Sequence, residues 1–270
     1  GHILPRGANI LQDEIDSAVL LSQQRKMLLN PLKTKAMLFN PHRIYDFVPT
    51  LTAGEEHIDV VEEQKILGYI LRSDLKTISN TEYICKRAYK RMWILRRLKS
   101  LGCPVHELLD VLQQQIMSIC EGSVPFWGPM ITQAESNMLE RCLKTGLHII
   151  YQEQYKTFSQ VLKLAGIKSL KLRRLELLTR FGKAAIRNEK YKNWFCPSEE
   201  REDARTRSKP VSLLKPVPCR TARYERSSLP VLTKLLSWHP PLRHKAMDLP
   251  RWIYTYICYY VNRDIPCIWL

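Results

Sequence analysis

The chain has 270 residues, enough for one or two domains with a buried core. Its 42 basic and 26 acidic residues leave a formal charge of +16, which favours polyanions: nucleic acid first, an anionic membrane surface second. The longest apolar run, Trp252 to Val261, is about half of the ~20 residues that a membrane-spanning helix needs, and no N-terminal segment has the pattern of a signal peptide. We therefore expect no membrane-spanning segment, and a nucleic acid rather than a membrane as the partner.

The first part of the chain, residues 1–75, predicts one helix followed by short strands. Apolar residues recur at helical spacing from Ile10 to Leu29, and Asn30-Pro31 should end that helix because proline cannot continue it. Strands are expected at 34–40, 57–61 and 65–71, between polar turns. Gly68 falls inside the last of these, where it either lets another backbone approach or marks a strand bulge.

The segment 76–195 predicts a helical bundle. Apolar residues fall at three/four spacing around Leu108, Leu112 and Ile116, again from 138 to 150, and again from about 170 to 188. Trp127, just before Gly128-Pro129, is expected in the core. The predicted fold class is mainly α with a small β part.

The first helix of this bundle carries the strongest candidate surface. Between Lys76 and Lys99 there are eight basic residues and one acidic residue. Helical spacing aligns three cations on one stripe, with two more beside it, whereas Trp93, Leu95 and Leu98 are expected to pack inward. The stripe and its neighbours are Lys86, Lys90 and Arg97, then Arg87 and Arg91. Such a row can contact phosphates, although a solvated surface is the alternative.

Arg173 and Arg174, near the start of the last predicted helix, also have two interpretations. They could reach phosphate groups, or they could form an ion-pair hub between helices.

The C-terminal part differs in composition. Residues 196–228 mix dense charge with proline and are expected to form a disordered linker, so that the folded core ends near Phe195. Residues 229–238 could form a short docking helix, and the aromatic end at 250–270 has no assigned role.

Eight cysteines are spread through the chain without a Cys-x-x-Cys pair. We expect reduced, buried side chains, because structural zinc ligands usually lie two to four residues apart. One wider set is a poor match to a zinc site: Cys196, Cys219, His239 and His244.

Several segments, in this order, resemble the reverse transcriptases of non-LTR retrotransposons of the jockey and LINE kind. The resemblance covers roughly residues 10–236. It rests on the Asn-Pro-Leu-Lys-Thr turn at 30–34, Lys-Ile-Leu-Gly at 65–68, MWILRRLK at 92–99, VPFWGPMIT at 124–132, LERCLKTGLHII at 139–150, Tyr155, and SLKLRRLELLTRFGKA at 169–184.

The resemblance implies the C-terminal part of an RNA-directed DNA polymerase. Residues 1–75 would end the palm, with Lys33 near the incoming nucleotide and with Lys65 and Gly68 in the primer grip. Residues 76–195 would form the thumb, which holds the primer and template. The family's aspartate pair, which holds two Mg²⁺ ions, is absent from this chain; the family places it just upstream of residues 4–16, where the sequence begins.

We therefore expect binding of RNA or DNA through the phosphate backbone, without polymerisation by this piece alone. Lys33 would be vestigial, no cofactor would bind the chain itself, and the missing palm and fingers would be a further partner. The alternative is a non-catalytic helical adaptor that binds a protein partner through apolar grooves. A nuclease is not favoured, because the acidic residues after 150 form no metal-binding signature.

Overall fold

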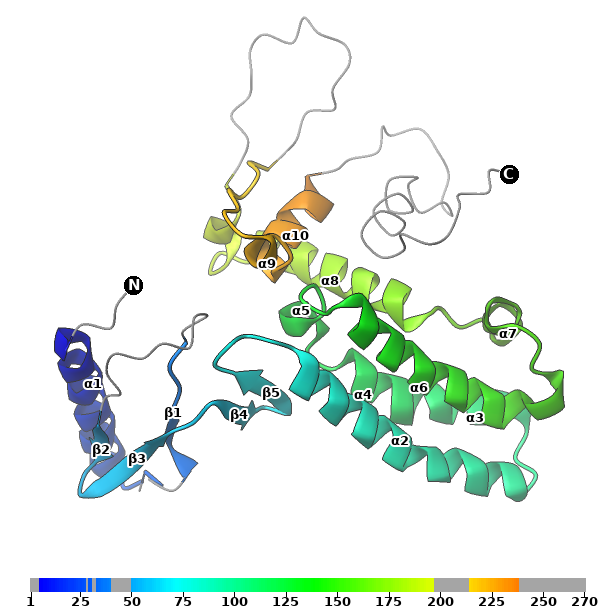
Figure 1. Ribbon diagram of the computed structural model, residues 1–270, viewed down its shortest axis with the longest axis horizontal. Helices are drawn as coiled ribbons and strands as arrows, with labels where there is room; N and C mark the ends of the chain where they lie inside the picture. Colours follow the sequence, from blue (N-terminus) through cyan, green and yellow to red (C-terminus); the bar gives the residue numbers. More distant parts are fainter. Residues whose placement is uncertain (1–4, 28, 31–32, 40–49, 197–213, 238–270) are drawn as a thin grey trace, which may run out of the picture. The chain divides into compact units, whose positions relative to one another are not determined.

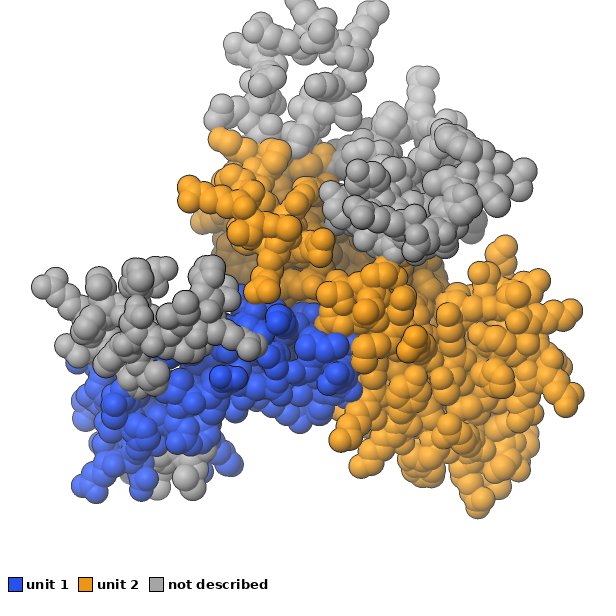
Figure 2. Space-filling view, in the orientation of Figure 1, with its two compact units in different colours: residues 1–83 blue, residues 84–270 orange. Residues whose placement is uncertain are grey.

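The computed structural model describes residues 5–27, 29–30, 33–39, 50–196 and 214–237 (Figure 1). Within these residues the chain is mainly helical with two small sheets, which confirms the coarse fold class. It divides into two compact units, Gly1–Tyr83 and Ile84–Leu270, coloured separately in Figure 2. None of the described helices combines the length and the apolar character needed to cross a bilayer.

The first unit packs one helix on a small sheet. The sheet has the order β1-β3-β2, in which β1 runs parallel and β2 antiparallel to β3. Leu51, Ala53 and Ile58 are buried, and Ile15 and Val19 of the helix pack against them. The elements are α1 (Pro5–Gln24), β1 (Lys35–Ala36), β2 (Leu51–Ala53) and β3 (Glu56–Val60).

The predicted end of the first helix at Asn30-Pro31 is wrong. Helix α1 begins at Pro5, a favourable first residue, and ends at Gln24. Lys26 has a φ of +54°. The N–H of Lys26 donates to the carbonyl of Gln23. The N–H of Met27 donates to the carbonyl of Ser22 at 2.8 Å. A left-handed residue thus closes the helix before the proline is reached.

The strand predicted at 65–71 is instead a hairpin of β4 (Glu63–Ile66) and β5 (Tyr69–Arg72). Leu67 and Gly68 connect the strands and have φ values of +49° and +85°. Positive φ at both positions matches the twist of antiparallel strands joined by a two-residue turn. Gly68 is therefore a turn residue and not a strand bulge, and apart from its chain neighbours none of the described residues lies within 4 Å of a Cβ placed on it. Leu67 at the tip is 98% exposed.

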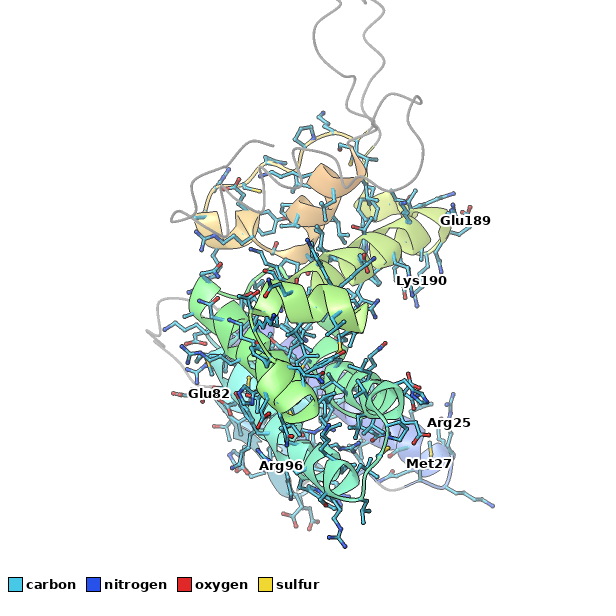
Figure 3. All side chains as sticks on the ribbon, turned by 90° about the vertical axis from the view of Figure 1, so that its right-hand side faces the viewer. Arg25, Met27, Glu82, Arg96, Glu189 and Lys190 are labelled. Carbon is cyan, nitrogen blue, oxygen red and sulfur yellow. The ribbon has the colours of Figure 1, made fainter. Side chains whose placement is uncertain are left out.

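The second unit is the helical bundle that the sequence predicted. Helix α2 begins in the first unit and continues into the second, and it carries Glu82 and Arg96, both labelled in Figure 3. The apolar positions Leu108, Leu112 and Ile116 are buried as expected, but the middle of that helix is π-helical. The elements are α2 (Ile78–Ser100), α3 (Val105–Val111), the π segment η2 (Leu112–Met117), α4 (Ser118–Glu121), α5 (Val124–Trp127), α6 (Gln133–Tyr151), the short η3 (Gln152–Gln154), α7 (Phe158–Ala165), α8 (Leu170–Arg187) and the short η4 (Lys192–Trp194).

The six cysteines that the structure describes are free thiols. Burial was expected for all of them, but this expectation is wrong for Cys196, which is exposed, and for Cys103 and Cys219, which are only partly buried. Cys85, Cys120 and Cys142 are buried. Hydrogen bonding with Cys120, together with burial, raises the pKa of the Cys142 thiol to about 12. This pKa keeps the Cys142 thiol protonated at neutral pH. Cys258 and Cys267 lie outside the described residues.

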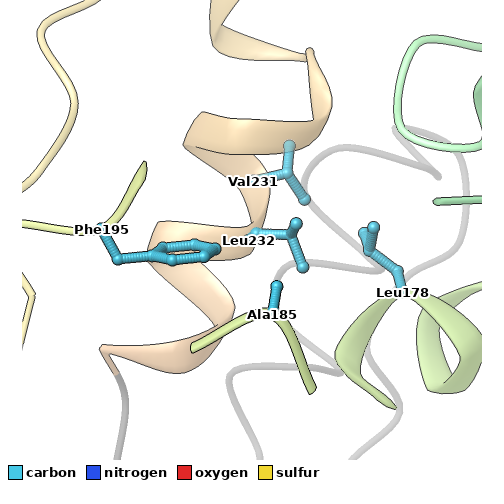
Figure 4. Packing of buried hydrophobic residues seen from close by; sticks show 5 residues of the cluster. All are labelled: Leu178, Ala185, Phe195, Val231 and Leu232. Atoms are coloured by element: carbon cyan, nitrogen blue, oxygen red, sulfur yellow. The ribbon is translucent and has the colours of Figure 1, made fainter. Parts of the chain in front are cut away.

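The expectation that the core ends near Phe195 is wrong for residues 214–237, whereas the short docking helix expected at 229–238 is confirmed as α10 (Ser228–Leu236). Two helices follow, α9 (Ala222–Glu225) and α10, and α10 packs against α8. Val231 and Leu232 of α10 join a buried cluster with Leu178, Ala185 and Phe195 (Figure 4).

Polar contacts also tie this segment to the bundle. The N–H of Lys215 donates to the carbonyl of Cys196 at 2.8 Å. The hydroxyl of Ser228 donates to the carbonyl of Pro125 at 2.6 Å. The linker expected at 196–228 is thus corrected for residues 214–228: apolar docking and backbone hydrogen bonds offset the cost of ordering this proline-rich stretch. Residues 197–213 and 238–270, the aromatic end included, lie outside the described part.

Candidate nucleic-acid interface

The cationic stripe predicted on α2 is exposed. Lys86, Lys90 and Arg97 all face solvent. At about 100° per residue they share one narrow sector of the helix and extend over ~16 Å along its axis. Among the residues that the structure describes, none of the three forms an ion pair. The helix holds them in place because its other face carries Met92 and Leu95, both 0% exposed in the core.

The cations beside the stripe are also at the surface. Arg87 and Arg91 are exposed, and the guanidinium of Arg91 donates to the side chain of Gln115 in η2. Arg96, which the sequence did not single out, is exposed as well. The exposed surface of α2 thus carries positive charge on both sides of the stripe as well as on it.

Trp93 is the residue that sequence reasoning misplaced. It was expected to pack inward, as Leu95 does, yet it is 62% exposed. The spacing 86, 90, 93 and 97 alternates four, three and four residues, so Trp93 lies on the stripe itself between Lys90 and Arg97. The same arithmetic that aligned the cations could have located it; its apolar character suggested the core instead.

The candidate site residues Lys65 and Lys33 of the first unit contact residues of the same unit. Lys65 is exposed on β4, and its ammonium lies 4.8 Å from the centroid of the Tyr83 ring, a cation–π contact. Lys33 is exposed at the end of a small turn, where its N–H donates to the Asn30 side chain at 3.2 Å. The hydroxyl of Thr34 donates to the carbonyl of Asn30 at 3.0 Å. Local hydrogen bonds therefore link Asn30 to Lys33 and to Thr34.

Arg173 takes the ion-pair role that the sequence left open. Its guanidinium donates twice to the carboxylate of Glu121 on α4, both at 2.8 Å, and lies 3.7 Å from that of Glu176. Hydrogen bonding to Glu121 raises the pKa of Arg173. This two-pronged contact links α4 to α8.

Arg174 is buried, with 8% of its surface exposed. It donates to the hydroxyl of Ser136 on α6, and it lines a cavity of about 340 Å³ together with Lys171, Arg226 and Thr132. Burial lowers the pKa of Arg174, and the nearby charge of Glu140 opposes that shift. A side chain so enclosed contributes to packing between α6 and α8, whereas the exposed row on α2 is open to a large polyanion.

Comparisons with models of protein families, with curated proteins and with solved structures found no match for this chain. We therefore infer its function from the charge, exposure and spacing of its own residues.

Proposed function

We propose that this chain binds nucleic acid through the phosphate backbone, using the row Lys86, Lys90 and Arg97 on α2. The observation that carries the proposal is that the three cations are exposed on one face of a helix whose opposite face is buried. The formal charge of +16 adds a long-range attraction for polyanions.

The physical basis is the release of counterions. Nucleic acid carries a condensed layer of cations, and each lysine or arginine that neutralises a phosphate releases some of them. A row on a helix meets several phosphates at once from a backbone that is already ordered, so only the side chains lose freedom on binding. Phosphate contacts carry no sequence information, so binding should tolerate any sequence.

The order of motifs that resembles non-LTR reverse transcriptases supports the same proposal, because in that family the thumb holds the primer and template. We propose that the chain corresponds to the end of a palm and a thumb of an RNA-directed DNA polymerase. The sequence contains no Asp-Asp pair, so it cannot hold the two metal ions of that chemistry by the family's means. Binding without polymerisation, with Lys33 vestigial, is the function proposed for this polypeptide.

A salt titration tests the proposal directly. Affinity for a fluorescein-labelled RNA–DNA duplex with an overhang would be measured by anisotropy over a range of salt concentrations. If five phosphates are contacted, log affinity should fall against log salt with a slope of about −4 to −5. Changing Lys86, Lys90 and Arg97 together to Glu should weaken binding and make the slope shallower by about 2 to 3.

A matched control exists on α8, where Arg180, Lys183 and Arg187 are also exposed at three/four spacing. Changing these three to Glu alters the net charge by the same amount away from α2, so the slope should stay close to that of the unmodified chain. An equal loss in both variants would mean that net charge alone governs binding. An affinity independent of salt would favour the adaptor that docks a protein through apolar contacts.

A further inference from the structure

Trp93 is an exposed aromatic side chain held on a rigid helix. It contrasts with Trp127, which is 0% exposed and donates its indole N–H to the carbonyl of Gly122 at 2.8 Å. Trp93 is 62% exposed, although the preceding residue, Met92, and Leu95, two residues further on, are wholly buried. A large apolar ring is thus left in water at a fixed position.

The surroundings of Trp93 restrict what can cover it. Lys90 lies one turn before it and Arg97 one turn after it, at neighbouring positions about 5–6 Å away along the same face. A second copy of this chain would bring the same cationic row against this one, and like charges at close range are unfavourable. The complementary surface therefore combines a flat ring with negative charge on both sides of it.

A nucleotide within a single strand has this composition: a planar base between two phosphates. In a duplex the faces of the bases are already stacked on each other, so Trp93 could reach only the backbone or an end. Aromatic side chains beside cations are the usual platform for unpaired bases, and such stacking tolerates any base because each has a π face.

We propose that Trp93 is a stacking platform for an unpaired nucleobase, with Lys90 and Arg97 contacting the phosphates that flank it. This inference rests on the proposed function, since α2 must bind nucleic acid for Trp93 to stack on a base. It adds a preference that phosphate contacts alone do not give: single strands and overhangs should bind more tightly than a blunt duplex of the same sequence.

The test compares Trp93→Ala and Trp93→Phe on two ligands, a single strand of about 12 nucleotides and the blunt duplex made from it. Trp93→Ala should weaken single-strand binding about 5- to 150-fold, because stacking on one base is worth that much in affinity. Trp93→Phe should retain most of the affinity, and blunt-duplex binding should change little in either variant. The salt slope should remain the same, because no charge is removed.

Trp194→Ala serves as the control, because Trp194 is 50% exposed on η4 rather than on α2. Its single-strand affinity should equal that of the unmodified chain. Circular dichroism and the melting temperature of each variant would show that the fold is retained, as expected for substitution of an exposed side chain.

The outcomes separate the two proposals. The stacking role would be overturned if Trp93→Ala lowered the affinity for single strand and duplex equally, or for neither. It would also be overturned if Trp93→Phe lost as much affinity as Trp93→Ala. None of these results would contradict phosphate binding by the cationic row. A salt slope unaffected by the triple charge change would overturn the proposed function instead.

Discussion

Glu140 and Arg174 bring opposite charges into the interior between α6 and α8. One carboxylate oxygen of Glu140 accepts the N–H of Lys171 at 2.7 Å. Its other oxygen, and Nη1 of Arg174, are buried and lack a hydrogen-bond partner among the described residues. Leaving buried polar atoms unsatisfied opposes folding, so this pair weakens the bundle relative to a fully bonded one.

The charge state of Glu140 should make stability depend on pH. Burial raises the pKa of Glu140 above its usual value of 4.5, and the hydrogen bond from Lys171 and the charge of Arg174 oppose the shift. The folded state then holds the proton more tightly than the unfolded state. The resulting stabilisation is complete below the unfolded pKa and is lost as pH rises through the folded pKa.

Glu140→Gln removes this titration while keeping an acceptor for the N–H of Lys171. We expect the unmodified chain to lose stability relative to this variant as pH rises from about 4 to 7, measured by urea denaturation at each pH. A relative gain for the unmodified chain at neutral pH would show that the attraction of Arg174 outweighs burial.

Residue type alone misled the sequence-based prediction at single positions. Trp127 was correctly expected in the core, where the bundle covers it on all sides, but the same expectation failed for Trp93. Arg173 and Arg174 are adjacent in sequence, yet one bridges to α4 and the other is buried against α6. A 100° step around a helix is enough to give neighbours different surroundings, and only the tertiary packing fixes which face is covered.

At the scale of elements, periodicity predicted the long helices well and their connections poorly. Three/four apolar spacing identified α6 and α8, whose apolar faces are buried. The Leu67-Gly68 turn was read as strand because its sequence carries an apolar residue where Asn or Asp is usual. Likewise, Lys26 closes α1 in a left-handed conformation, and the sequence did not predict this end because Gly or Asn usually occupies such a position.

The crossing of α8 and α10 gives a prediction at this scale. A Cβ added at Gly182 of α8 would lie 2.6 Å from Cδ2 of Leu232 and 2.8 Å from Cδ1 of Leu236 on α10. Gly182→Ala should therefore destabilise the chain by about 1–3 kcal/mol through overpacking, despite alanine's higher helix propensity. Urea denaturation would measure the change, and hydrogen exchange should become faster in α10.

A double-mutant cycle identifies the contact responsible. Leu232→Ala alone should cost about 2–5 kcal/mol, because Leu232 is buried and truncation leaves a cavity. Combined with Gly182→Ala, the total should be smaller than the sum, since the shortened side chain leaves room for the new methyl group. If Gly182→Ala instead stabilised the chain, α8 and α10 would not pack this closely.

At the scale of the whole molecule, the sequence predicted a β-containing N-terminal part and a helical C-terminal part, and the structure has two compact units of that kind. The predicted end of the folded core failed because composition measures the average polarity of a segment. Docking of α10 depends on a few apolar side chains, Val231 and Leu232 among them, that follow a polar stretch. The local sequence identified a short docking helix at 229–238, but it could not show that this helix joins the core of α8, which lies far away along the chain.

The last prediction concerns where the folded unit ends. Removing residues 197–270 would uncover Leu178, Ala185 and Phe195, which Val231 and Leu232 cover in the full chain. Each of the two lost side chains buries apolar surface worth about 1.5–3 kcal/mol, so the melting temperature of the shortened chain should fall by several degrees. A chain ending at Ser237 keeps α10 and is the matched control; its melting temperature should exceed that of the chain ending at Cys196. Equal melting temperatures for the two shortened chains would show that α10 contributes nothing to the bundle, and the boundary expected near Phe195 would then hold.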